Sequence, residues 1–184
     1  MRIVAKRILA IGTTNQRISI NKQLVDFASS LLNESESERI DMIPYDLPIF
    51  SADRHDEEGV PEQVIGFRGI MSEYDGFIVS LAEHNGSYTA VFKNLIDWIS
   101  VLEGKVWQQK PVLLLSTSPG PRGACTVLGI AENYFPHMGA RVTGSFSLAS
   151  FHEHFDEKEG ITDNEKLTEL KEKIAEFESA VLGS

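Results

Sequence analysis

Five stretches of the chain have the apolar pattern of β-strands, and segments with helical spacing separate them. The predicted strands are residues 7–12, 39–44, 77–81, 112–115 and 141–148. The fourth, Val112–Leu115, has no polar residue, which is typical of a central parallel strand covered on both faces. The second carries charged residues, and we therefore expect it nearer the edge of the sheet.

Apolar residues spaced three and four apart predict a helix after each strand. The first begins near Ser19, and the polar run at residues 33–38 closes it. Pro61 suits the first position of the second helix, which runs to about Tyr74. Further helices are predicted over residues 91–101, 127–135 and 167–181.

The remaining long segments are predicted to be loops or caps. Residues 45–59 contain Pro48 and a charged cluster, and residues 151–160 are acidic. Both segments are expected to be irregular. Asp163 or Asn164 is expected to cap the last helix, because both side chains can accept hydrogen bonds from free helix N–H groups.

Alternation of strand and helix predicts an α/β fold with a parallel sheet and helices on both faces. Five strands with a ligand turn after the first favour the strand order 2-1-3-4-5, as a three-layer sandwich. No linker or repeat divides the chain, so residues 1–184 are expected to form a single domain.

Charge and cysteine content narrow the classes of partner. The 17 basic and 27 acidic residues give a net charge of −10, which disfavours binding to nucleic acid. The single cysteine, Cys125, allows no internal disulfide. The first residues lack the apolar region of a signal peptide, and no stretch is long enough to span a membrane, so a cytoplasmic protein is expected.

The turn after the first strand, residues 12–21, is rich in hydrogen-bonding side chains. It precedes a helix, whose first N–H groups and dipole favour a bound anion. Arg17 can add a full positive charge, and the other donors are Thr13, Thr14, Asn15 and Ser19. We interpret the turn as a phosphate site, the alternative being that Ser19 only caps the helix. It matches neither the Walker pattern nor the dinucleotide fingerprint.

The turns after the third and fourth strands, residues 82–87 and 116–123, would lie at the same edge of the sheet. Gly86 permits positive φ, so this turn could lay main-chain amides along a flat heterocycle. Taken alone, however, a plain loop with Ser87 or Thr89 as a helix cap is the favoured interpretation. The proline- and glycine-rich third turn could wall a pocket or simply connect two elements. His84 could stack, donate a proton or do neither.

Other candidate residues favour structural interpretations. Cys125 is expected to be a small buried packing residue rather than a nucleophile. His152 and His154 are assigned to a solvated loop rather than to a metal site. Trp98 is expected in the core or at a subunit interface, and Trp107 to be partly exposed.

At these turns the chain resembles the NADPH-dependent FMN reductase family of flavodoxin-like proteins, which includes quinone, azo-dye and chromate reductases. The resemblance covers about residues 8–148. Its most specific part joins Glu83-His84-Asn85-Gly86-Ser87 to Phe92-Lys93-Asn94-Leu95-Ile96-Asp97-Trp98. The first turn and the segment from Lys110 to Gly123 match more weakly.

The resemblance implies an FMN-dependent oxidoreductase. Electrons would pass from NAD(P)H through bound FMN to a small acceptor, such as a quinone or a free flavin, by ping-pong exchange, with no side chain needed as acid or base. The phosphate and its surroundings would be held by Thr13, Arg17, Ser19 and Asn21. The flavin ring would be lined by Glu83, His84, Asn85, Gly86, Ser116, Thr117, Ser118, Pro119 and Gly120. Homodimers or homotetramers are implied, with the helix carrying Trp98 as the candidate interface.

The sequence departs from the family pattern near the expected flavin. The first loop is one residue longer, which weakens the assignment of Arg17. Leu81-Ala82 replaces a frequent Thr-Pro, His84 replaces tyrosine, and Ala124 stands where a second glycine is common. Two alternatives therefore remain open, a flavodoxin-like electron carrier and a flavin-free binding module on the same fold.

Overall fold

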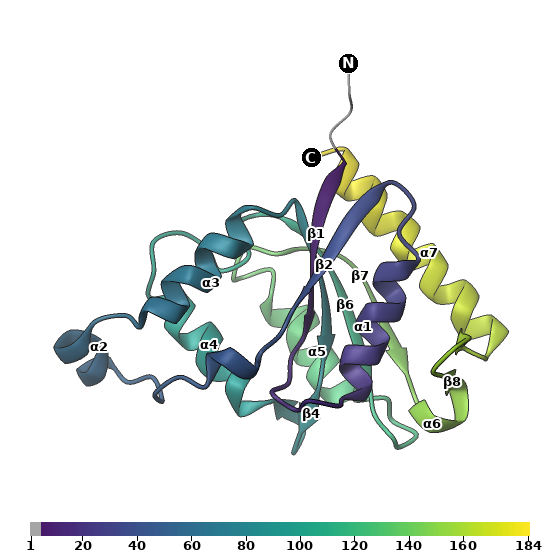
Figure 1. Cartoon of the computed structure of the whole chain (residues 1–184), viewed down its shortest axis with the longest axis horizontal. Helices are drawn as coiled ribbons and strands as arrows, with labels where there is room; N and C mark the ends of the chain where they lie inside the picture. The colour runs from purple at the N-terminus through teal and green to yellow at the C-terminus, as the bar shows by residue number, and fades with distance from the viewer. Residues whose placement is uncertain (1–4) are drawn as a thin grey trace.

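A computed structural model describes residues 5–184 and contains the predicted five-stranded sheet (Figure 1). All its strands are parallel, in the order β2-β1-β3-β6-β7, which is the predicted 2-1-3-4-5 order. The strands are β1 (Lys6–Gly12), β2 (Ser35–Ile40), β3 (Gly76–Leu81), β6 (Pro111–Thr117) and β7 (Arg141–Leu148). The fold class inferred from the sequence is therefore confirmed.

Helices cover both faces of the sheet, as Figure 1 shows. One face carries α1 (Ile20–Ser30) and α7 (Asn164–Leu182). The other carries α3 (Glu62–Ser72), α4 (Ala90–Ser100) and α5 (Cys125–Tyr134). Alternate residues of the central strands point to opposite faces of the sheet. In β1, Ile8 and Ala10 pack on the side of α1 and α7, and Leu9 and Ile11 pack on the side of α3, α4 and α5.

Most of the helix caps are residues that the sequence predicted for this role. Ser19 caps α1, Thr89 rather than Ser87 caps α4, and Asp163 rather than Asn164 caps α7. Pro61 is the N-cap of α3 rather than its first helical residue. The caps of α1 and α4 matter for the site because both helices begin beyond the carboxyl ends of strands.

The second strand is misplaced in the sequence prediction. It was expected over residues 39–44, but β2 begins at Ser35, inside the polar run that was expected to close α1. Its side chains are largely exposed because β2 is an edge strand, so the apolar signal is absent. Main-chain pairing with β1 defines this strand instead, and residues 43–45 form a short 3-10 helix, η1 (Ile43–Tyr45).

The two predicted loops contain regular structure. Residues 45–59 include α2 (Ala52–Glu58), capped by Ser51. Residues 151–160 include α6 (Phe151–His154) and β8 (Phe155–Asp156), which pairs with β9 (Gly160–Ile161). α2 has no buried residue and begins at the Ser51 cap, whereas β8 and β9 form by pairing with each other. These elements are short, and their sequences carry little periodicity.

Two single-residue expectations are wrong, and a third is confirmed. Trp107 is fully buried rather than partly exposed, with its ring stacked on Phe135 at 4.5 Å. Cys125 is exposed rather than buried, because the methyl group of Ala124 fills the core position at the start of α5. Trp98 is fully buried within the chain, which confirms the first of its two expected places, the core.

Within residues 5–184, no helix is both long and apolar enough to cross a bilayer.

Candidate functional site

A cavity of about 450 Å³ opens at the carboxyl ends of β1, β3 and β6. All three turns singled out from the sequence contribute to it, and a fourth segment closes one side. Its lining residues are Thr14, Gln16, Ile18, Ser19, Ile20, Asn21, Gln23, Ala82, Glu83, His84, Thr117, Ser118, Pro119, His152 and Glu157. Its volume and its position at this edge are those of ligand sites in open α/β sheets.

The first turn is anchored by Thr13, which lies beneath the cavity and is fully buried. Its N–H donates to the Ser80 carbonyl at 2.9 Å, and its hydroxyl oxygen accepts from the Ala82 N–H at 3.0 Å. The Thr13 carbonyl accepts from the Thr89 hydroxyl at 2.6 Å. Thr13 therefore ties the first turn to the second, and the neighbouring Thr14 lines the cavity in its place.

Two more predicted residues stand at the start of α1. Ser19 caps α1, because its Oγ accepts from the Asn21 N–H at 3.2 Å, and it also lines the cavity. Asn21 is buried, donating to the Thr117 carbonyl at 3.3 Å and accepting from the Ser80 hydroxyl at 2.9 Å. The helix start thus meets the cavity with its N–H groups and positive dipole end.

Arg17 does not line the cavity, although the first turn that carries it does. Its side chain is exposed, and no ion pair of Arg17 occurs in the part of the chain described. The guanidinium is therefore not engaged by a carboxylate there.

The second turn is a two-residue β-hairpin between β4 (Glu83–His84) and β5 (Ser87–Tyr88). Asn85 and Gly86 both have positive φ, 53° and 76°, which is the conformation that Asn-Gly favours in such turns. Glu83 and His84 line the cavity, while Asn85 and Gly86 form the tip and do not. One carboxylate oxygen of Glu83, Oε2, accepts from the Val127 N–H at 2.9 Å.

Tyr88 closes the hairpin on its buried side. Burial, followed by the nearby Tyr134, raises the pKa of Tyr88 to about 12. The ring packs against Phe92 and Phe135. Tyr88 therefore stays protonated at neutral pH and supports the hairpin by packing.

The third turn is held from below by hydroxyl groups. The fully buried Ser116 donates to the Gly123 carbonyl at 2.7 Å, and Thr117 donates to the Leu148 carbonyl at 2.7 Å. The Gly120 carbonyl accepts from the Ser150 N–H at 2.9 Å. Of the predicted residues, Thr117, Ser118 and Pro119 line the cavity, whereas Ser116 and Gly120 support the turn.

The sequence interpretation missed the fourth wall, which His152 and Glu157 provide. The Phe151 N–H donates to the Ser118 carbonyl at 3.1 Å and so brings this segment against the third turn. The predicted strand order could have indicated this wall. Because β7 lies beside β6 in a parallel sheet, the residues that follow both strands lie at the same edge of the sheet. Residues 5–184 contain no group of three side chains suited to a metal ion.

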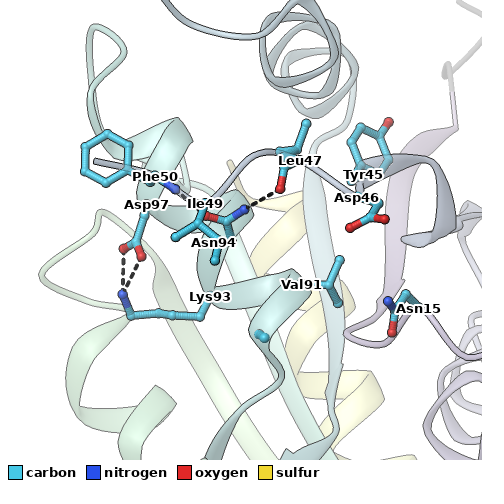
Figure 2. A pocket seen from close by; sticks show the side chains of 11 residues that line it. Asn15, Tyr45, Asp46, Leu47, Ile49, Phe50, Val91, Lys93, Asn94 and Asp97 are labelled. Atoms are coloured by element: carbon cyan, nitrogen blue, oxygen red, sulfur yellow. Dashed lines mark hydrogen bonds and ion pairs between the residues drawn. The ribbon is translucent and has the colours of Figure 1, made fainter. Parts of the chain in front are cut away.

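A second cleft, of about 380 Å³, lies on the other side of the first turn (Figure 2). The segment at residues 46–51, here called the strap, crosses α4 there. Asn94 fixes it by donating to the carbonyls of Leu47 and Pro48 and accepting from the Phe50 N–H. The buried Trp98 also donates to the Pro48 carbonyl, at 2.8 Å. Asn15 joins this cleft rather than the first.

Comparison with known proteins shows the family to which this chain belongs. The family model described as NADPH-dependent FMN reductase matches residues 6–154. The chain belongs to the NADPH-dependent FMN reductase family. Membership implies an enzyme, with FMN as the cofactor and NAD(P)H as the electron donor.

Individual relatives align with most of the length of this chain. It is 30% identical to a 2-hydroxy-1,4-benzoquinone reductase of Burkholderia sp, over 80% of this chain and 87% of that protein. It is 29% identical to the NADH:(hydroxy)cinnamate reductase subunit CrdA of Vibrio ruber, over 92% of this chain and 84% of the relative. The flavoenzyme NAD(P)H:(acceptor) oxidoreductase FerB of Paracoccus denitrificans shares the fold, with a TM-score of 0.78 and 24% identity, covering 97% of this chain and 98% of FerB.

The residues around the first cavity fit FMN. Hydroxyl and amide groups of Thr14, Gln16 and Ser19 surround the start of α1, the end of a helix that suits a phosphate. His84 supplies a planar ring and Pro119 a compact apolar ring, on two different turns. The donor set is therefore compatible with a phosphate at one end and a planar ring at the other.

Proposed function

We propose that this chain is an FMN-dependent NAD(P)H oxidoreductase that delivers electrons to a small acceptor, such as a quinone, free flavin or another small oxidant, by ping-pong exchange. The observation that carries the proposal is the convergence of the α1 start, the Asn-Gly hairpin and the third turn on one cavity. The names of the curated relatives, a benzoquinone reductase among them, support an acceptor of this class.

The site residues divide into two groups in this proposal. Thr14, Ser19 and the α1 N–H groups would hold the phosphate, with Arg17 free to approach it. The ring would lie between the hairpin, Glu83 to Gly86, and residues 117–120. The buried Thr13, Asn21 and Ser116 would act by holding these turns in place.

FMN, when bound, supplies the two-electron chemistry, and the chain supplies binding, orientation and a local positive field. That field matters because the whole chain carries a net charge of −10, which opposes an anionic cofactor. The α1 N-terminus and Arg17 would offset this repulsion locally. No side chain in the cavity is required as a proton donor.

The broader expectations from the sequence also stay proposals. We expect residues 1–184 to behave as one flavodoxin-like domain, in the cytoplasm, as a homodimer or homotetramer. Because Trp98 is internal, a subunit contact would use other residues. Size-exclusion chromatography with light scattering measures the assembly.

A visible spectrum tests the cofactor and the donor together. The protein is incubated with FMN, desalted and titrated anaerobically with NADPH and, separately, NADH. Retained yellow colour that bleaches with either donor supports the proposal. Parallel double-reciprocal plots with 1,4-benzoquinone as the second substrate support the ping-pong order.

Two results would instead favour the alternatives. Colour that is retained but does not bleach indicates an electron carrier. Absence of FMN binding in a direct titration indicates a flavin-free module on the same fold.

A further inference from the structure

Glu83 makes a contact that its place in the second turn does not predict. Its Oε2 accepts a hydrogen bond from the main-chain N–H of Val127 at 2.9 Å, across 44 residues of sequence. Val127 is the third residue of α5. Glu83 is the first residue of the short hairpin strand β4, which follows β3. The carboxylate therefore links the second turn to the helix that follows the third.

Helix α5 lacks a cap of its own. The residue at its N-cap is Ala124, which has φ 60° and no side chain able to accept a hydrogen bond. The Cys125 N–H bonds to the Arg122 carbonyl, and the Leu128 N–H to the Ala124 carbonyl. The Val127 N–H, between them, is satisfied by Glu83. A carboxylate suits this place because the helix start carries partial positive charge.

Both ends of this link are rigid. Glu83 is paired in register with Tyr88 across the hairpin. At the other end, the Gly123 carbonyl accepts from the hydroxyls of Ser116 and Ser147, at 2.7 and 2.9 Å, immediately before α5 begins. The hydrogen bond from Val127 to Glu83 therefore joins two segments that are each held by other hydrogen bonds.

We propose that Glu83 is a positioning residue, whose carboxylate fixes the gap between the hairpin and the third turn by capping α5. This rests on the proposed function, in which these two turns flank the flavin ring. The charge of Glu83 is directed at the helix rather than at the anionic cofactor. Glu83 is thus not a ligand of the ring through its side chain, although the resemblance alone implied that it lines it.

The test compares Glu83→Ala with Glu83→Gln, because a glutamine retains an acceptor oxygen. Loss of a hydrogen bond to a charged group leads us to expect FMN to bind about tenfold or more weakly in E83A. In E83Q the dissociation constant should stay within about threefold of the unchanged protein. The visible band of bound FMN should shift in E83A and return in E83Q. Fluorescence quenching of FMN measures the affinities.

Glu178→Ala is the matched control. Glu178 is a nearly buried carboxylate on α7 that accepts from the N–H groups of Asn33, Glu34 and Ser35, at 2.9 to 3.0 Å. These lie at the amino end of β2, the opposite edge of the sheet from the cavity. E178A should unfold at lower urea while keeping its FMN affinity, which separates positioning from general stability.

Amide exchange tests the link without any cofactor. In the ¹⁵N-labelled apoprotein, the Val127 amide should exchange faster in E83A than in the unchanged protein or E178A. Equal Val127 protection in E83A, or equal FMN affinity in E83A and the unchanged protein, overturns the positioning role while leaving the proposed function intact. Failure of the unchanged protein to bind FMN overturns both.

Discussion

At the scale of single residues, several side chains predicted to contact a cofactor form hydrogen bonds that hold the turns. Thr13, Asn21 and Ser116 are buried and form hydrogen bonds to the main chain or to Ser80. Hydroxyl and amide groups can serve either purpose, so residue type locates a site without distinguishing its lining from its supports. Asn21 also lines the cavity, whereas Thr13 and Ser116 do not, and Thr14 and Gln16 line it beside them.

Gly123 allows the first prediction. Its φ is +56°, and an added Cβ would overlap Ser147 Oγ and approach the Ala149 N–H nitrogen at 3.1 Å. Gly123→Ala should therefore destabilise the protein by about 2 kcal/mol or more, measured by urea unfolding, because strain and overlap add. Gly59 also has positive φ, +78°, but open space around it. Gly59→Ala should cost about 1 kcal/mol. Equal losses would mean that Ser147 does not constrain the turn.

At the scale of elements, the run from Lys93 to Trp98 has a structural explanation. Asn94 and Trp98 face the strap and bind its main-chain groups, whereas Lys93 and Asp97 form an exposed ion pair one turn apart. Spacing of three and four residues on α4 thus separates the strap-binding side from the solvent side. Figure 2 shows Asn94 between the helix and the strap.

Asn94→Ala should release the strap. The variant loses three hydrogen bonds to residues 47, 48 and 50, so we expect a loss of about 1–3 kcal/mol. Limited proteolysis should cut residues 46–51 faster than in the unchanged protein. The control is Asn133→Ala, whose amide donates to the Gly129 carbonyl within α5. Unchanged proteolysis in N94A would show that Trp98 and packing hold the strap alone.

At the scale of the whole molecule, the sheet is held in register at its amino edge by Asp75. Its carboxylate accepts from the Arg7 N–H at 2.8 Å and pairs with Lys6 at 3.1 Å, which aligns the starts of β1 and β3. Burial raises the pKa of Asp75, but the Arg7 N–H and Lys6 outweigh it and hold the pKa below the ordinary 3.8. The folded state therefore favours the charged carboxylate.

The sign of the pH dependence follows from that depressed pKa. The stabilisation by Asp75 is complete above the unfolded pKa of about 3.8 and disappears as pH falls through the lower folded value. Asp75→Asn should therefore be less stable at pH 7, with the difference shrinking below about pH 4. Urea unfolding at pH 7 and pH 3 measures it, with the exposed Asp56→Asn as control. A difference independent of pH would refute the argument.

The architecture could be read from the amino-acid sequence, because apolar runs mark strands that pack into the core and helical spacing marks helices with one buried face. β3, β6 and β7 and the caps Ser19 and Asp163 follow from it. It also located three of the cavity's four walls. The tertiary structure decided what local pattern cannot encode: the polar edge strand β2, the wall from His152 and Glu157, and the pairing of Glu83 with α5. Each depends on contacts between residues distant in sequence, whose partners become known only once the chain has folded.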